Sequence, residues 1–467
     1  MKYSVITFGC RVNQADSIGF EEDLLAAGAV AGPPDAADLV VVNTCSVTAA
    51  SDQGARQTIR RVARDNPGAR IVVTGCYATS RPEEVGGLPN VFRVVPNDDK
   101  PHLLPMLMAD GLARLGRVRL PPSRDASAVA EALADRRSLG GGWSAGRRLD
   151  GCGQPDPTTA ERFGDGEGGC GAAIEPGVAG RTAFTLRVQT GCAESCSYCI
   201  IPATRGTPRS VAVNEVLREV DRVAAAGFKE VALTGVHLGS YGRDLTPPSS
   251  LIELLRALDG LRAARSDFLF RVSSLEPMDC SREIVDLLAT SERFAPHVHL
   301  PLQHASGGML AAMRRPYTIE YFASLVDDIR ERLPQASIGS DVIVGFPGET
   351  AEDFEQLAAY LERSPLTHLH VFPYSDRPDT VASTMGGKVE GRAIRERGRR
   401  AREIGRGLAD RFRAAQVGTS HRALTLDDGT LAVTGNYLKV RIPPGRARNE
   451  WVRVRIASQH DGELLGC

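Results

Sequence analysis

The sequence has almost no net charge and no long apolar run. Its 56 Lys and Arg residues stand against 57 Asp and Glu residues, which leaves a formal net charge of −1. Any affinity for nucleic acid must therefore come from a local basic patch rather than from an overall field. No stretch approaches the roughly 18 apolar residues of a membrane span, and "MKYSVITFGC" lacks the basic start and apolar run of a signal peptide. We expect a cytoplasmic protein without a membrane segment.

Cysteine is plentiful, with ten in 467 residues. In a cytoplasmic protein this number indicates metal or redox chemistry rather than a disulfide framework. Six cysteines have patterned surroundings: Cys10, Cys45, Cys76, Cys192, Cys196 and Cys199. We interpret the other four as structural or incidental: Cys152, Cys170, Cys280 and Cys467.

Three apolar runs near the start of the chain each lead into a cysteine. The apolar runs lie at 3–8, 38–43 and 70–75, and helical patterns lie between them at 16–27 and 51–65. The alternation predicts buried parallel strands in an α/β domain over 1–112, with a βαβ sandwich architecture. Carboxyl ends of parallel strands share one edge of a sheet. We therefore expect Cys10, Cys45 and Cys76, here called the N-terminal triad, to meet there in a metal site.

The composition changes twice further along the chain. Residues 113–180 are rich in glycine and poor in periodicity, which predicts a linker or insertion containing Cys152 and Cys170. A second alternating domain is expected over 181–408. Its candidate strands are 184–189, 230–236, 268–274, 297–303, 336–346 and 368–375. Six βα units predict a complete or partial parallel barrel with its site at the carboxyl ends of the strands.

The last part of the chain is basic. Residues 391–413 carry nine arginines against three acids, which fits either a helix with a solvated face or a nucleic-acid contact. Short alternating strands then predict a small β-barrel over 409–467. Within it, residues 436–456 hold six Lys or Arg residues against one acid, with Tyr437 among them. This basic stripe is a candidate RNA surface.

Three further cysteines lie on one short loop after the first barrel strand. "CAESCSYC" gives Cys192, Cys196 and Cys199 the spacing CxxxCxxC, and we call them the loop triad. Structural zinc sites and cubane [4Fe–4S] clusters are normally closed by four protein ligands. Three thiolates on a cubane would leave one iron open to another ligand. From the spacing alone, a zinc site or an incidental arrangement stays open.

The surrounding motifs resemble the radical S-adenosylmethionine (SAM) superfamily and, within it, the methylthiotransferases. The loop "CSYCIIPATRGTPRS" carries the resemblance, together with "LTGVHLGSYG", "RVSSLEP", "HLPLQ" and "SDVIVGFPGET". It covers the chain apart from the insertion near 115–180. It implies an N-terminal methylthiotransferase domain, a partial (β/α)6 barrel and a C-terminal RNA-binding barrel of the TRAM type.

The resemblance implies two [4Fe–4S] clusters and SAM as cofactors. The loop triad would hold the cluster whose open iron chelates SAM, and an injected electron would cleave SAM to a 5′-deoxyadenosyl radical and methionine. Positions that match cofactor contacts are Tyr198 near the adenine, then Thr234, Gly235, Ser274, Glu276 and Gly345. The last five also fit ordinary strand-end or turn structure.

The N-terminal triad would hold the auxiliary cluster that carries the sulfur to be transferred. By the resemblance, one SAM methylates this sulfur, and a second yields the radical that removes hydrogen from an unactivated carbon. That carbon then captures the methylthio group. Two open-iron clusters facing one cavity would explain why both triads stop at three.

Three substrate branches compete: N6-threonylcarbamoyladenosine beside the anticodon of tRNA, isopentenyl-adenosine in tRNA, and an aspartate of a small-subunit ribosomal protein. "FGCRVNQADS", "HVFPYSDRPDT" and "VTGNYLKV" are most similar to the first. "PLQHAS" is more similar to the third, and "VVPNDDK" departs from the usual Gly-Asn turn.

Two other functions remain open at this point. A non-catalytic iron–sulfur RNA-binding factor would yield no 5′-deoxyadenosine when reduced with SAM, and a radical SAM enzyme without sulfur insertion would not need Cys45. For the methylthiotransferase, we expect tRNA and a flavodoxin- or ferredoxin-like electron donor as partners, and a monomeric enzyme.

Overall fold

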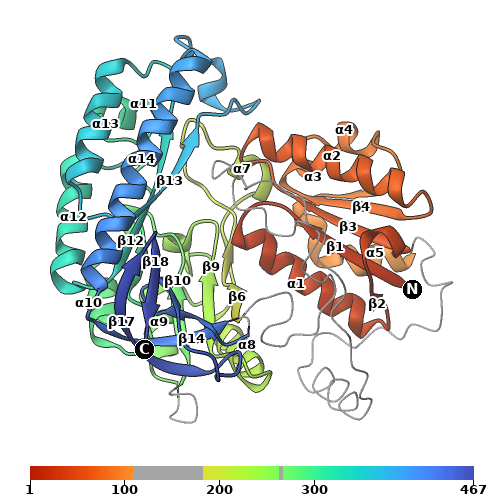
Figure 1. The fold of residues 1–467 in the computed structure, drawn as a ribbon. Helices are drawn as coiled ribbons and strands as arrows, with labels where there is room; N and C mark the ends of the chain where they lie inside the picture. Colours follow the sequence, from red (N-terminus) through yellow and green to blue (C-terminus); the bar gives the residue numbers. More distant parts are fainter. Residues whose placement is uncertain (110–181, 262–266, 427) are drawn as a thin grey trace.

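The computed structural model describes four stretches of the chain: 1–109, 182–261, 267–426 and 428–467. The predicted linker at 113–180, with Cys152 and Cys170, lies outside them. Figure 1 shows an N-terminal α/β unit beside a larger α/β unit, with a small blue β-barrel near the carboxyl terminus. The α/β fold class predicted from the sequence is confirmed. Among the described residues, no helix combines the length and the apolar character needed to cross a membrane.

The N-terminal unit contains a five-stranded parallel sheet with the order β2-β1-β3-β4-β5. The strands are β1 (Lys2–Thr7), β2 (Val30–Ala31), β3 (Leu39–Thr44), β4 (Arg70–Gly75) and β5 (Val91–Val95). The three predicted strands are confirmed as β1, β3 and β4. Strands β2 and β5 were not predicted, because β2 has two residues and β5 is only partly buried.

Helices cover both faces of this sheet and give it two apolar cores. Helix α2 (Ala49–Asp65) packs on one face, and α1 (Arg11–Ala26) and α5 (Leu103–Ala109) pack on the other. Helix α1 begins five residues before the predicted start at 16. Its first turns carry buried polar side chains, Asn13, Gln14 and Asp16, which leave no apolar period in the sequence. The short helices α3 (Cys76–Ser80) and α4 (Pro82–Gly86) follow β4.

The central unit is a partial barrel of six parallel strands. They form two sheets, with orders β10-β9-β6 and β11-β12-β13. Their bounds are β6 (Ala183–Arg187), β9 (Glu230–Thr234), β10 (Leu269–Val272), β11 (His297–His299), β12 (Ser337–Val344) and β13 (His368–Pro373). The backbone N–H of Leu275 donates to the carbonyl of His299 at 2.9 Å and joins the two sheets. The predicted (β/α)6 partial barrel is therefore confirmed.

Six helices pack on the outside of these strands and share one core with them. They are α8 (Val213–Ala225), α9 (Leu251–Asp259), α10 (Arg282–Thr290), α12 (Ile319–Arg332), α13 (Ala351–Arg363) and α14 (Gly391–Gln416). Helix α14 crosses the predicted boundary at 408/409, where Leu408 is buried against the core. Several arginines of α14 pair with nearby acids, such as Arg397 with Glu349 at 2.6 Å. These ion pairs give the paired arginines a structural role.

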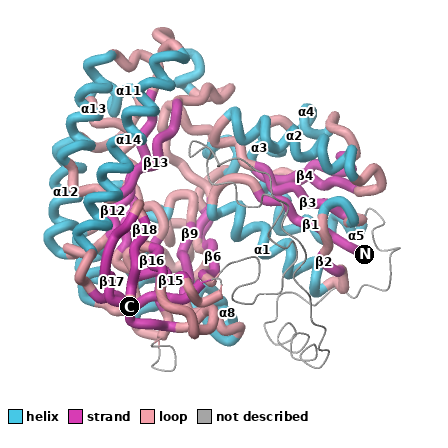
Figure 2. Tube along the Cα trace, viewed as in Figure 1, coloured by secondary structure: helices cyan, strands magenta, loops and turns pink. Residues whose placement is uncertain are grey.

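The chain ends in a closed five-stranded barrel, as predicted. Its strands are β14 (Ser420–Leu426), β15 (Leu431–Thr434), β16 (Lys439–Arg441), β17 (Trp451–His460) and β18 (Glu463–Gly466). Figure 2 shows these strands gathered in magenta beside the lower part of the central unit. Trp451 Nε1 donates to the carbonyl of Asp267 at 2.9 Å, and Arg271 donates to the carbonyl of Gly435 at 2.9 Å. These contacts fix the small barrel against the central one.

Candidate active site

The N-terminal triad lies at the carboxyl edge of the N-terminal sheet. Cys10 immediately precedes α1, Cys45 follows β3 directly, and Cys76 begins α3 after β4. Strands β1, β3 and β4 are neighbours in the sheet, so the structure brings the three thiols together. Burial, together with the nearby Cys10 and Cys76, raises the pKa of Cys45 to about 12. All three are free cysteines.

Two glycines allow the chain to approach this edge closely. Gly9 has φ +88°, and a Cβ there would lie 2.4 Å from Cys45 Sγ. Gly75 has φ +96°, and its Cβ would lie 2.1 Å from the carbonyl oxygen of Thr44. Both positions therefore require glycine, for its backbone conformation and for its missing side chain.

Two buried cationic side chains lie close to the N-terminal triad. Arg205 and Lys100 lie near Cys76 and lower the pKa of its thiol, although burial alone would raise it. Asn97 Nδ2 lies 3.7 Å from Cys76 Sγ as a hydrogen-bond donor. The Asp16 carboxylate neutralises part of the positive charge of these two side chains. Its Oδ2 lies 2.7 Å from Lys100 Nζ and 3.4 Å from Arg205 Nη2. None of these four residues was predicted from the sequence.

The loop triad lies between β7 (Gln189–Thr190) and the short helix α7 (Ile201–Arg205). The backbone N–H of Cys192 donates to the carbonyl of Gly206 at 3.0 Å, which closes the base of the loop. Burial, together with the nearby Cys196 and Cys192, raises the pKa of Cys199 to about 12. The three thiols therefore share one environment.

Arg315 connects the loop triad to a predicted SAM contact. Its Nη1 donates to Cys196 Sγ at 3.1 Å, and its Nη2 forms an ion pair with Glu276. On the other side of the loop, His237 contacts Cys192 and forms a 2.8 Å hydrogen bond with Asp279. Sequence reasoning missed Arg315 and His237, because both lie in loops without periodicity.

The remaining predicted cofactor positions lie at strand ends and turns. Thr234 ends β9 and is buried, whereas Ser274 follows β10 and is exposed. A Cβ on Gly235 would lie 2.7 Å from Leu238 Cδ2, so close packing alone explains this glycine. Gly345 has φ +81° and packs closely on Ile394. Tyr198 packs against a separate apolar cluster: Met309, Met313, Ile343, Phe346 and Ala382.

Helix α7 joins the two triads. It begins two residues after Cys199 and ends at Arg205, beside Cys76. With a helical rise of about 1.5 Å per residue, the five residues of this helix span about 7.5 Å. Asn97 Nδ2 also donates to the carbonyl of Thr204 at 2.7 Å, which fixes α7 to the N-terminal unit. Figure 1 shows α7 between the two units, next to α3.

The three thiols of neither triad lie close enough together to hold one zinc ion. Two ligands of one zinc ion, with Zn–S bonds of about 2.3 Å, lie at most about 4.6 Å apart. Among the described residues, the one group of three His, Cys, Asp or Glu side chains with all ligand atoms within 4.8 Å contains no cysteine. The N–H groups that Arg315 and Asn97 direct at sulfur are typical of iron–sulfur sites. Both triads therefore fit a [4Fe–4S] cluster.

Comparisons with known proteins agree with this geometry. The model of the radical SAM superfamily matches residues 186–361, and that of the uncharacterized protein family UPF0004 matches residues 2–95. The radical SAM methyltransferase TsrM from Kitasatospora setae has the same fold over 82% of this chain and 74% of its own, with a TM-score of 0.52 at 17% identity.

Two curated relatives cover almost the entire chain. A threonylcarbamoyladenosine tRNA methylthiotransferase, MtaB, from Aquifex aeolicus is 35% identical over 98% of this chain and 100% of its own length. A ribosomal protein uS12 methylthiotransferase, RimO, from Roseiflexus sp. is 31% identical over 100% of this chain and 97% of its own. With its cysteine triads, its barrel and these relatives, the chain belongs to the radical SAM methylthiotransferase family, whose cofactors are SAM and [4Fe–4S] clusters.

Proposed function

We propose that this protein methylthiolates C2 of N6-threonylcarbamoyladenosine beside the anticodon of tRNA. The observation that carries the proposal is identity along nearly the full chain to relatives named for this reaction. Besides the Aquifex protein, the MtaB proteins of Bacillus subtilis and Thermotoga maritima are 33% and 30% identical over 84% and 99% of this chain. The RimO relative makes a uS12 aspartate the second candidate substrate.

The proposed ligand sets are the two cysteine triads, with SAM on the loop triad. When bound, the clusters and SAM would pass on the donor's electron and supply the radical and the sulfur for the reaction. The residues of the chain hold and shield these groups. Arg315 would fix Cys196 and Glu276 relative to each other, and the half-buried Tyr198 and the buried Thr234 would exclude water from the cofactor.

Charge on the small barrel supports RNA as the partner. Along β17, Arg453 and Arg455 alternate with buried Val452 and Val454, so both arginines face solvent. Lys439 and Arg441 on β16, and Arg446 and Arg448 beyond it, are exposed as well. Such a basic face contacts phosphates. The ring of Tyr437 packs against Arg271 and His297, and about half of this residue stays exposed beside the basic face.

The enzyme would act in the cytoplasm as a monomer, with electrons from a flavodoxin- or ferredoxin-like donor. The proposal is tested with anaerobically reconstituted protein, dithionite, SAM and three substrates in parallel. These are anticodon stem-loops carrying threonylcarbamoyladenosine or isopentenyl-adenosine, and a uS12 peptide. We expect a mass increase of one methylthio group only on the first. Product on the peptide alone would reassign the protein to the second candidate.

A further inference from the structure

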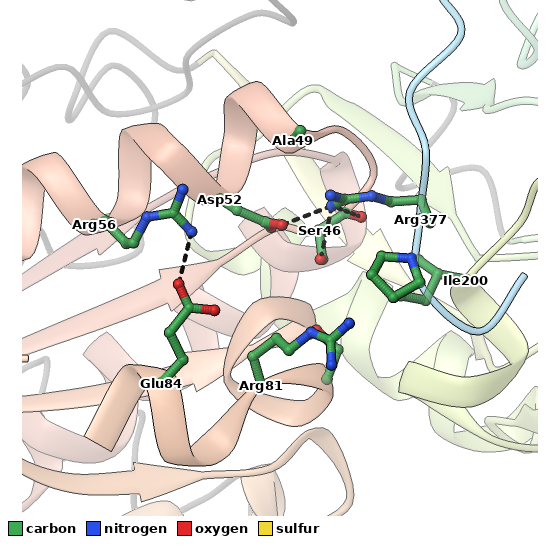
Figure 3. A pocket seen from close by; sticks show the side chains of 10 residues that line it. Ser46, Ala49, Asp52, Arg56, Arg81, Glu84, Ile200 and Arg377 are labelled. Atoms are coloured by element: carbon green, nitrogen blue, oxygen red, sulfur yellow. Dashed lines mark hydrogen bonds and ion pairs between the residues drawn. The ribbon is translucent and has the colours of Figure 1, made fainter. Parts of the chain in front are cut away.

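A cavity of about 200 Å³ lies between the N-terminal unit and the central barrel (Figure 3). One side is formed by α2, α3 and α4, and the other by the residue after Cys199 and the loop after β13. Residues that follow cysteines of both triads in the sequence line this cavity. Its lining residue Ser46 follows Cys45, Ile200 follows Cys199, and Ser80 ends the helix that begins at Cys76.

The lining has one positive charge in excess. Three arginines and two acids line the cavity: Arg56, Arg81, Arg377, Asp52 and Glu84. Arg377 Nη1 lies 2.7 Å from Asp52 Oδ2, and both side chains are largely buried. Arg56 Nη1 lies 3.0 Å from Glu84 Oε1. Each acid therefore already has an arginine partner.

Arg81 is the remaining cation. Its side chain is half-buried and, among the residues that the structure describes, has no hydrogen-bond or ion-pair partner. Figure 3 shows it reaching from the junction of α3 and α4 toward the side of the cavity formed by Ile200. A guanidinium has five N–H donors in a planar fork that matches a carboxylate. An unpaired arginine at the wall of such a cavity is therefore suited to bind an anion.

We propose that this cavity is the receptor for the free carboxylate of the threonyl group on the substrate base, with Arg81 as its specificity-determining residue. This inference rests on the proposed function. At about 200 Å³ the cavity is smaller than the roughly 300–1,000 Å³ of a typical small-molecule site, so its size suits a substituent rather than a nucleoside. A base held between the triads would direct this substituent into the cavity. An isopentenyl group carries no charge and would leave Arg81 unpaired.

The test is equilibrium binding by the reconstituted holoenzyme, measured by fluorescence anisotropy under anaerobic conditions. The probes are three anticodon stem-loops, carrying threonylcarbamoyladenosine, its carboxamide analogue, or unmodified adenosine. For the wild type, we expect the first RNA to bind about tenfold more tightly than the other two, the usual size of a charge-assisted contact. Arg81→Gln should abolish this preference without changing the affinity for unmodified RNA, and Arg81→Lys should retain part of it.

Arg60→Gln is the matched control, because Arg60 is exposed on α2 and lies outside the cavity lining. Arg81 makes no side-chain capping bond to either helix, so its replacement leaves the fold intact, which iron content and circular dichroism verify. Equal weakening of all three RNAs by Arg81→Gln would identify a phosphate contact and overturn the inference. A preference that survives in Arg81→Gln would also overturn it. In both cases, methylthiolation of the threonylcarbamoyl RNA by the wild type would show that the proposed function still holds.

Discussion

Removal of the Asp16 carboxylate should destabilise the junction between the two α/β units. Asp16 lies on α1 with a side chain 1% exposed, and it pairs with Lys100 of the N-terminal unit. It also pairs with Arg187 and Arg205 of the central unit. Loss of one partner from a buried ion pair costs about 3–5 kcal/mol, because the remaining charges stay buried and unpaired. For Asp16→Ala, we expect a loss of unfolding free energy in this range.

Urea denaturation of the apoprotein, followed by far-UV circular dichroism, measures this loss. The control is Glu403→Ala, which removes an exposed i,i+4 partner of Arg399 on α14 and should cost only about 0.3–0.5 kcal/mol. The pKa of Asp16 is lowered, since its three cationic partners outweigh burial, which alone would raise it. Its contribution is therefore complete above the unfolded pKa of about 3.9 and is lost only as the pH falls through the lower folded pKa. The cost should be equal at about pH 6 and about pH 8, and a value no larger than the control would refute the reasoning.

Three further predictions concern the clusters and the RNA. Cys45→Ala should lower the iron content from about eight to about four atoms per polypeptide. The variant should still cleave SAM but form no thiolated product. Cys280→Ala, outside both triads, should leave the iron content and the product yield unchanged. Arg315→Met should slow 5′-deoxyadenosine release about 10- to 100-fold, because it removes an N–H donor to the loop triad; an unchanged rate would contradict that role. Arg453→Gln with Arg455→Gln should weaken tRNA binding and reduce the slope of log K against log salt by about 1.5, whereas an unchanged slope would place the RNA elsewhere.

The sequence predicted those parts of the fold that periodicity encodes. Strands such as β3, with six consecutive buried residues, appear as apolar runs, and each of the three central N-terminal strands leads into a cysteine. Helix α1 contains buried polar residues that hydrophobic periodicity does not reveal. Its first two turns have the polar sequence of an exposed helix, yet Asn13 and Asp16 are buried there against Lys100 and Arg205.

The charged residues around the triads could not be predicted from the sequence, because their partners come from distant segments. Arg205 lies close in sequence to the loop triad but contacts Cys76 of the other unit. Arg315 reaches Cys196 from 119 positions away. Tyr437 of the small barrel contacts Arg11 and Arg271, and the sequence did not predict either contact. These pairings depend on how the units are docked, which local sequence does not encode.

The most direct test of the proposed reaction is mass spectrometry of tRNA nucleosides from a strain that lacks this protein. We predict complete loss of 2-methylthio-N6-threonylcarbamoyladenosine, accumulation of its unthiolated precursor, and recovery with the wild-type chain but not with Cys45→Ala. An unchanged level of the methylthio nucleoside in the deletion strain would contradict the assignment.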